Sequence, residues 1–165
     1  MLKLILILTV LNISVTAEKT WYLHIIDGNG SGADGVRLAD INGDNLPDTV
    51  TGWEESGVTR IYLNPGKEKV KARWPVAEVG KTKSVEDAFL QDLDGDGQPE
   101  VITCCEGKEK SVFIHWSPGK DRLLLKNSWQ QMLIPSSKNL TSWMFAQAMQ
   151  VDDKAGIDII SRRQK

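Results

Sequence analysis

An acidic loop followed by a β-strand pattern occurs twice in this chain, and that repeat constrains the fold more than any other feature. Residues 40–48 read Asp-Ile-Asn-Gly-Asp-Asn-Leu-Pro-Asp, and residues 92–100 read Asp-Leu-Asp-Gly-Asp-Gly-Gln-Pro-Glu. The two loops begin 52 residues apart, at Asp40 and Asp92. Similarity extends to both sides of each loop, so the repeated element is a structural unit and not only a turn.

A third, degenerate copy follows at residues 149–160. Its last acidic position, Asp158, lies 58 residues after Glu100, its equivalent in the second copy. Gln150 and Lys154 stand at the first and fifth positions, where the other copies have aspartates. Because Lys154 brings a cation of its own, we expect no metal ion at this third loop.

Each unit is expected to contain four short strands. Segments with β-branched and alternating apolar residues lie between clusters of Gly, Pro, Asn and Asp, which is typical of strands joined by turns. After residue 17 no stretch shows apolar residues at helical spacing over the length of a helix. The expected strands are residues 36–39, 49–53, 58–63 and 76–79, and then 88–91, 101–105, 111–116 and 131–134.

Four strands in about 50 residues is the size of one β-propeller blade, in which four-stranded sheets pack face to face around a channel. The sequence therefore predicts an all-β fold, a β-propeller of four-stranded blades. Its repeats are expected at about residues 34–84, 85–142 and 143–165, the last incomplete, or about two and a half blades. Since known rings have at least four blades, we expect residues 18–165 to be part of a longer propeller. A small two-sheet β domain with a polar tail is the alternative.

The acidic loops predict two calcium sites. Carboxylates at positions 1, 3, 5 and 9 of a tight turn converge, and they would repel one another unless a cation lay between them. Oxygen ligands in a flexible loop suit Ca²⁺, with a main-chain carbonyl at position 7 completing the set. The predicted ligands of the second loop are Asp92, Asp94, Asp96, Gln98 and Glu100.

The first loop is predicted to bind the ion more weakly because it has three charged ligands in place of four. Its predicted ligands are Asp40, Asn42, Asp44, Leu46 and Asp48, with Leu46 supplying a carbonyl. Neither loop is an EF-hand, since position 12 is Thr51 or Thr103 where that loop requires a bidentate Glu. Solvated turns without a metal are the alternative, because Asp, Asn and Gly are common in turns.

At these residues the chain resembles the FG-GAP/VCBS repeat family, found in the propellers of integrin α-subunits and in many exported bacterial proteins. The resemblance covers about residues 34–160 and rests on the acidic core with its Pro and the strand that follows. It implies a propeller with calcium in the loop between the first two strands of a blade. The Phe-Gly and Gly-Ala-Pro signature is absent, so the VCBS type is the better match.

Residues 1–17 are predicted to be a secretory signal peptide. Lys3 precedes an apolar run at residues 4–11, and small residues at 15–17 provide a cleavage site. The run is too short to span a bilayer, although an uncleaved anchor or a buried N-terminal strand is the alternative. We therefore expect the mature protein to be secreted, periplasmic or at the cell surface, with no membrane span.

Charge and cysteine content exclude several other classes. The net charge of −2 provides no basic footprint for nucleic acid. Cys104 and Cys105 are adjacent, and neighbouring side chains of a strand point to opposite faces. We expect one buried thiol and one near the surface, with a strained disulfide between them as the alternative. Neither cysteine has a partner at a zinc-type spacing.

Two functions are compatible with this sequence. The favoured one is a binding or adhesion scaffold for an extracellular protein or glycan, in which calcium is structural. The alternative is part of a propeller enzyme of the polysaccharide lyase or quinoprotein type, although no nucleophile–base–orienter pattern is evident. Candidate residues for such a site are His24, Asp34, Glu86, Asp87 and His115, with Trp53, Trp74 and Trp143 as sugar-stacking platforms or, alternatively, as packing residues.

Overall fold

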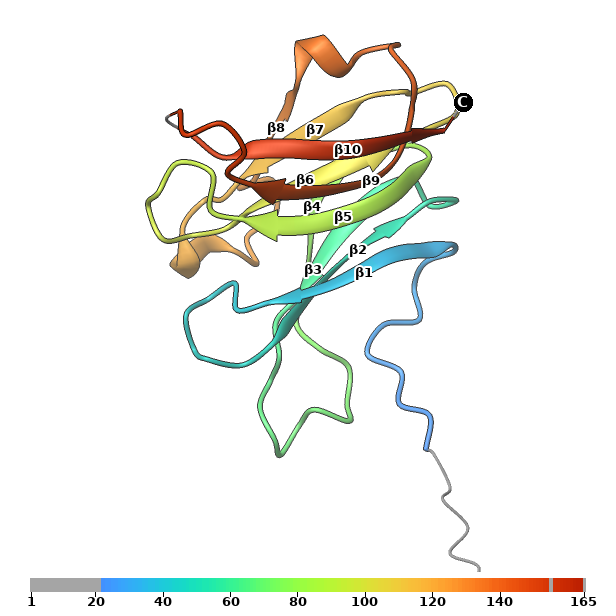
Figure 1. Ribbon diagram of the computed structural model, residues 1–165. Helices are drawn as coiled ribbons and strands as arrows, with labels where there is room; N and C mark the ends of the chain where they lie inside the picture. The colour runs from blue at the N-terminus through green and yellow to red at the C-terminus, as the bar shows by residue number, and fades with distance from the viewer. Residues whose placement is uncertain (1–21, 155, 165) are drawn as a thin grey trace, which may run out of the picture.

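The computed structural model describes residues 22–154 and 156–164 (Figure 1), so the predicted signal peptide at residues 1–17 lies outside the described residues. The described chain is almost entirely β-structure. Its helices are two 3₁₀ turns, η1 (Lys120–Arg122) and η2 (Pro135–Ser137), and no described helix is long and apolar enough to cross a bilayer. The predicted all-β class is confirmed.

Ten strands form three antiparallel sheets within the described residues. The first two sheets have four strands each, hydrogen-bonded in chain order, and the third is a single hairpin. All eight strands predicted for the first two units are present, with shifts of a few residues at their ends. The strands are β1 (Ala33–Ala39), β2 (Asp48–Trp53), β3 (Val58–Tyr62), β4 (Val76–Lys81), β5 (Val85–Gln91), β6 (Glu100–Cys105), β7 (Val112–Trp116), β8 (Gln130–Leu133), β9 (Ser142–Met149) and β10 (Asp158–Gln164).

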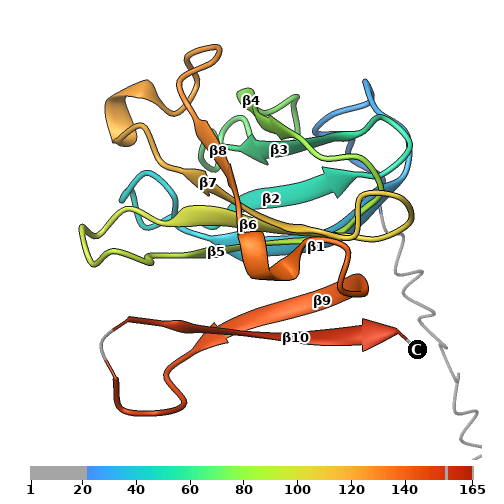
Figure 2. The same cartoon turned by 90° about the horizontal axis from the view of Figure 1, so that it is seen from above.

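The first strands of the three units lie next to one another. β1 contacts β5, and β5 contacts β9, in the order seen from bottom to top in Figure 1. The second sheet therefore lies between the first sheet and the β9–β10 hairpin, which forms a separate layer in Figure 2. Equivalent parts of each repeat are thus stacked side by side.

Two apolar clusters fill the spaces between these layers. Successive side chains of a strand point to opposite faces, so Ala88 and Val101 pack toward the first sheet, while Phe89 and Ile102 pack toward the hairpin. Every residue of β6 is buried, because its sheet is covered on both faces. Burying one Val or Ile side chain contributes about 1.5–3 kcal/mol, so both layers stabilise β6.

The two cysteines correct one prediction. Cys104 and Cys105 are both fully buried and both are free thiols, whereas we expected one of them near the surface. They point to opposite faces of β6, as predicted for neighbours on a strand. The prediction failed because it assumed that one face of this strand met solvent.

β1 and β5 approach each other closely where both are bulged. The register of β1 with β2 shifts between Asp34 and Arg37, and that of β5 with β6 shifts between Val85 and Asp87. Gly35, with φ of 60°, is so close to Asp87 that a Cβ atom would lie 2.5 Å from its Oδ1. Only glycine accommodates both the backbone angle and this approach.

Candidate metal centre

The three acidic loops lie at the same end of the strands, on the left in Figure 1. Each is closed by the same hydrogen bond, in which the carboxylate at position 9 accepts from the backbone N–H at position 2. The distances are 2.9 Å from Ile41 N to Asp48 Oδ2, 2.9 Å from Leu93 N to Glu100 Oε2, and 3.0 Å from Val151 N to Asp158 Oδ2. The degenerate third loop therefore keeps the closing contact of the other two.

The first aspartate of each complete loop holds the turn through backbone amides. Asp92 accepts from Gly95 N at 2.8 Å and from Gly97 N at 2.9 Å. Asp40 accepts in the same way from the amides of Gly43, Asp44 and Asn45, at 2.8, 3.1 and 2.8 Å. The glycines and Asn45 have positive φ, which explains why the repeat has Gly or Asn at these positions.

The second loop brings three of its predicted ligands together. Carboxylate oxygens of Asp92, Asp94 and Glu100 lie within 4.8 Å of one another. The fourth predicted carboxylate, Asp96, is not in this group, and its Oδ1 accepts a hydrogen bond from Gln98 N at 2.7 Å. The convergence predicted from the spacing is therefore found for positions 1, 3 and 9.

In the two complete loops the carboxylates at position 9 are buried, although they belong to charged residues. Glu100 is 2 % exposed, and burial raises its pKa, with further raising by Asp94 and Asp96 opposed by backbone hydrogen bonds. Burial likewise raises the pKa of Asp48, while the amides of Asn64 and Ile41 lower it. An ionised carboxylate in such a place needs a compensating positive charge.

The first loop is arranged differently from the second. Asn42 donates its side-chain N–H to Asp44 Oδ2 at 3.0 Å, and its Oδ1 accepts from Asp44 N at 2.9 Å. Leu46 N donates to Asp44 Oδ1 at 2.8 Å, so both carboxylate oxygens of Asp44 have partners within the loop. The described residues of this loop do not form a three-carboxylate group like that of the second loop.

In the third loop, one lysine ammonium group and one glutamine side-chain amide take the place of converging carboxylates. The Lys154 ammonium group forms an ion pair with Asp152 and lowers the pKa of that carboxyl group. The Gln150 side chain donates to the carbonyls of Lys154 and Gly156, at 2.7 and 2.9 Å. This loop thus satisfies its polar groups internally.

The donor set of the second loop fits a hard divalent cation. Its side-chain ligands are all carboxylate oxygens, and Ca²⁺ takes six to eight oxygens in flexible geometry. A carboxylate cluster of this kind without nitrogen or sulfur donors does not suit Zn²⁺. The first loop also offers oxygen ligands, but it has fewer negatively charged ligands for a cation.

Comparison with known protein families agrees with this geometry. Residues 40–103, which run from the first loop through the second and into β6, match the family model of the FG-GAP-like repeat. This segment is an FG-GAP-like repeat. No curated protein and no solved structure gives a significant match to the chain. The family resemblance seen in the sequence is confirmed for these residues, and the VCBS type stays a prediction.

The FG-GAP-like segment also contains Asp87, a candidate for an enzyme site. Asp87 is completely buried and forms an ion pair with Arg37 Nη2 at 2.9 Å. Its Oδ2 also lies 3.4 Å from Ala146 N on β9. The side chain therefore joins the first strands of all three units.

The two histidines lie in different surroundings. His115 is buried, its Nε2 lies 3.1 Å from Thr103 Oγ1, and burial lowers its pKa to about 4. His24 is exposed in the segment that precedes β1. Neither belongs to a group of three metal-ligating side chains in the described part of the chain.

The tryptophans proposed as stacking platforms use their indole N–H groups within the protein. Trp53 donates to Tyr62 Oη at 2.8 Å, Trp74 to Val70 O at 2.9 Å, and Trp143 to Ser137 O at 3.0 Å. Trp143 also packs on the apolar cluster between the second sheet and the hairpin. All three are partly buried.

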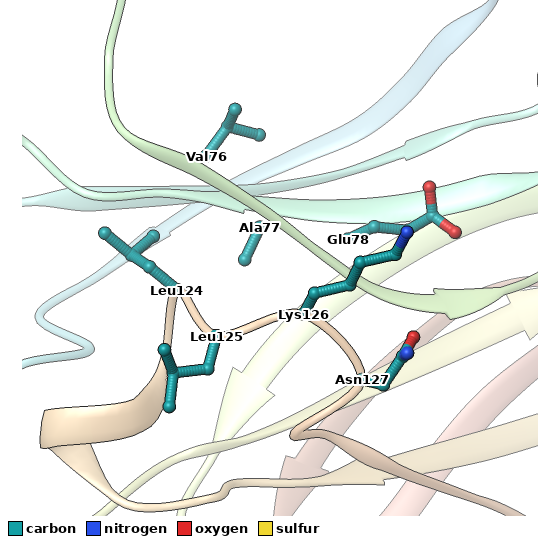
Figure 3. A pocket seen from close by; sticks show the side chains of 7 residues that line it. All are labelled: Val76, Ala77, Glu78, Leu124, Leu125, Lys126 and Asn127. Carbon is teal, nitrogen blue, oxygen red and sulfur yellow. The ribbon is translucent and has the colours of Figure 1, made fainter.

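A pocket of about 290 Å³ lies outside the FG-GAP-like loops, between β4 and residues 124–127 (Figure 3). None of the predicted ligands or enzyme residues lines it. Figure 3 shows apolar side chains at one end and the side chains of Lys126 and Asn127 turned toward Glu78 at the other. Its lining residues are Val76, Ala77, Glu78, Leu124, Leu125, Lys126 and Asn127.

A second acidic group was not predicted as a group. Carboxylate oxygens of Glu54, Glu86 and Glu106 lie within 4.8 Å of one another, and the sequence suggested only Glu86. The repeat carries the missing information, because Glu54 and Glu106 are 52 residues apart, the same offset as the two acidic loops.

Proposed function

We propose that this chain is part of an exported β-propeller that binds two calcium ions in its FG-GAP-like repeats and acts as a binding or adhesion scaffold. The observation that carries the calcium proposal is the group of Asp92, Asp94 and Glu100, whose carboxylate oxygens approach within 4.8 Å of one another. The side-by-side stacking of β1, β5 and β9 supports the propeller, since the first strands of blades line its centre.

The residues that would hold the ions are those of the two complete loops. Asp92, Asp94 and Glu100 would hold the tighter ion, with Asp96 and the carbonyl of Gln98 as further ligands, and the weaker ion would lie in the loop from Asp40 to Asp48. A bound calcium ion supplies positive charge among these carboxylates. Because the loop ligands converge only in the folded chain, binding would add to folding stability.

The scaffold is favoured over an enzyme because of what the enzyme candidates do in this fold. Asp87 is paired with Arg37 and lies near β9, and His115 on β7 is buried against Gly80 of β4. A catalytic group must reach a substrate, and the buried position of these two side chains prevents that. Ligands would instead bind exposed surfaces whose position the calcium loops stabilise.

The test is to measure binding and turnover together. The protein without residues 1–17 is applied to arrays of extracellular glycans and matrix proteins in calcium and in EDTA, and assayed for polysaccharide cleavage and quinone-dependent oxidation. The scaffold predicts a calcium-dependent ligand and no turnover. If the protein shows turnover, and Asp87→Asn abolishes it at unchanged melting temperature, the scaffold proposal is contradicted and an enzyme is favoured.

A further inference from the structure

Three partly buried glutamates meet at the end of the strands opposite the acidic loops. Glu54 follows β2, Glu86 lies on β5, and Glu106 follows β6, so two sheets contribute to the group. Their carboxylate oxygens lie within 4.8 Å of one another. We call these three residues the glutamate cluster.

The repeat itself builds the cluster. Glu54 and Glu106 are 52 residues apart, and so are Gly32 and Ser84, to which they are hydrogen-bonded. Glu54 N donates to Gly32 O at 2.6 Å, and Glu106 N donates to Ser84 O at 2.8 Å. Asp34 stands at the position in the first unit that Glu86 has in the second. Corresponding acids of two stacked units therefore lie together at the contact between the first two sheets. We call this contact, of β5 with β1 and β2, the seam.

The backbone around the cluster is closely packed. Glu86 is the bulged residue of β5, because Val85 pairs with Cys105 and Asp87 pairs with Cys104. A bulge re-aims its side chain, and this one lies where β5 meets β1 and β2. Gly52 on β2 is so close to Val85 that a Cβ atom would lie 2.7 Å from its methyl groups. Repulsion in the cluster therefore acts directly on the contact between the first two sheets.

The neighbouring charges offer little compensation. No Lys or Arg of the described residues forms an ion pair with the cluster, and Arg37 on β1 is paired with Asp87. Burial raises the pKa of Glu86 to about 7, with further raising by Glu106, Glu54 and Asp34. Burial also raises the pKa of Glu54. Of the charged and titratable groups on the surrounding elements, Asp34 on β1, Glu55 after β2 and Cys105 on β6 interact electrostatically with members of the cluster. The others on these elements are Arg37 on β1, Lys83 before β5, Asp87 on β5 and Glu109 after β6.

We propose that the glutamate cluster is a pH-sensitive device that shares a proton when the seam between the first two sheets is tight, and that loss of this proton loosens the seam. The direction in which stability changes with pH follows from the linkage between proton binding and folding. The folded chain holds this proton more strongly than the unfolded chain, whose glutamates titrate near 4.5. The stabilisation is complete below pH 4.5 and is lost as the pH rises through about 7.

The first test follows the carboxyl groups by NMR. The side-chain carboxyl ¹³C of Glu86 is titrated from pH 4 to 9 in the protein without residues 1–17, at a fixed calcium concentration of about 1 mM, the upper end of the dissociation constants of extracellular calcium modules. The midpoint should lie near 7 and should fall by roughly one unit in Glu54→Gln or Glu106→Gln, since each removes one like charge. A midpoint near 4.5 in the unaltered protein would overturn the proposal.

Calcium itself provides a second check. The titration is repeated at a tenfold higher calcium concentration. The proposal predicts an unchanged midpoint, whereas a midpoint lowered by calcium would identify the cluster as a cation site and overturn the shared proton. Loss of the two loop sites would leave this outcome unaffected, so the test is independent of the proposed function.

The second test measures the consequence for stability. Melting temperature is recorded from pH 5 to 8.5 at the same calcium concentration for the unaltered protein, for Glu86→Gln and for the exposed control Glu78→Gln on β4. The unaltered protein and the control should lose stability as the pH rises, while Glu86→Gln should lose less and melt higher at pH 8. Parallel curves for all three would contradict the proposal. If Glu86→Gln does not fold, Glu54→Gln is used with the same expectation.

Discussion

Arg37 on β1 donates two hydrogen bonds to the buried carboxylate of Asp87 on β5, from Nε at 3.2 Å and from Nη2 at 2.9 Å. The side chain of Arg37 is 47 % exposed, whereas that of Asp87 is fully buried. Asp87 also lies near Ala146 N on β9, and Gly35 packs directly against it. This ion pair therefore lies where the first strands of all three units meet.

Replacing Asp87 with Asn should destabilise the fold. The substitution removes a charge-assisted bidentate contact and leaves Arg37 without its partner, so the free energy of unfolding should fall by about 1–3 kcal/mol. Urea unfolding followed by tryptophan fluorescence measures the change. Asp121→Asn on the exposed η1 turn is the control and should be neutral. Equal stability of the two variants would show that Asp87 does not join the strands.

Gly80 is predicted to be irreplaceable by a larger residue. A Cβ atom at this position would lie 2.3 Å from Cε1 of the fully buried His115 and 2.8 Å from Gln131 Oε1. Gly80→Ala should cost about 1–3 kcal/mol through overpacking. Gly28→Ala, whose Cβ would meet its nearest neighbour at 3.6 Å, should cost far less in the same unfolding experiment. A neutral Gly80→Ala would mean that the two sheets pack less tightly than described.

The effect of calcium on stability should grow with pH. Burial raises the pKa of Glu100 and of Asp48, so protons compete with the ion at these carboxylates. Without calcium, both groups contribute less stability as the pH rises through their raised pKa values, and a bound ion reverses that loss. The calcium-induced rise in melting temperature should therefore be larger at pH 7 than at pH 5. The same rise at both values would argue against binding at these carboxylates.

The third loop should gain a calcium site when its carboxylates are restored. Asp152 and Asp158 are present and Asp158 already closes the loop, so Gln150→Asp with Lys154→Asp would recreate the acidic pattern. Calorimetry should then show one more calcium site than in the unaltered protein. Binding at this loop before substitution, or no added site after it, would contradict the repeat interpretation.

Much of the fold could be predicted because the repeat is dense in local signals. The turn residues and the acidic loops mark strand boundaries, which is why all eight strands of the first two units were found. The burial of both Cys104 and Cys105 could not be predicted in the same way. It depends on the hairpin covering β6, and that is a tertiary contact with no counterpart in local periodicity.

The candidate site was predictable to a similar extent. The spacing of acidic residues at every second position identified the carboxylates. Only the fold shows that Asp96, which accepts a hydrogen bond from Gln98 N, lies apart from the three carboxylates whose oxygens approach one another. The ion pair of Asp87 could not be predicted from the local sequence, because its partner Arg37 is 50 residues away in the chain.

The most direct measurement is calorimetric titration of calcium into EDTA-stripped protein lacking residues 1–17, with melting temperature recorded before and after. The account predicts two sites and a higher melting temperature with calcium. Asp94→Asn, which keeps a hydrogen-bond acceptor but removes one charge, should abolish the tighter site and spare the weaker one, while Asp153→Asn in the third loop should change neither. The absence of both calcium heat and calcium-dependent stabilisation in the unaltered protein would contradict the account.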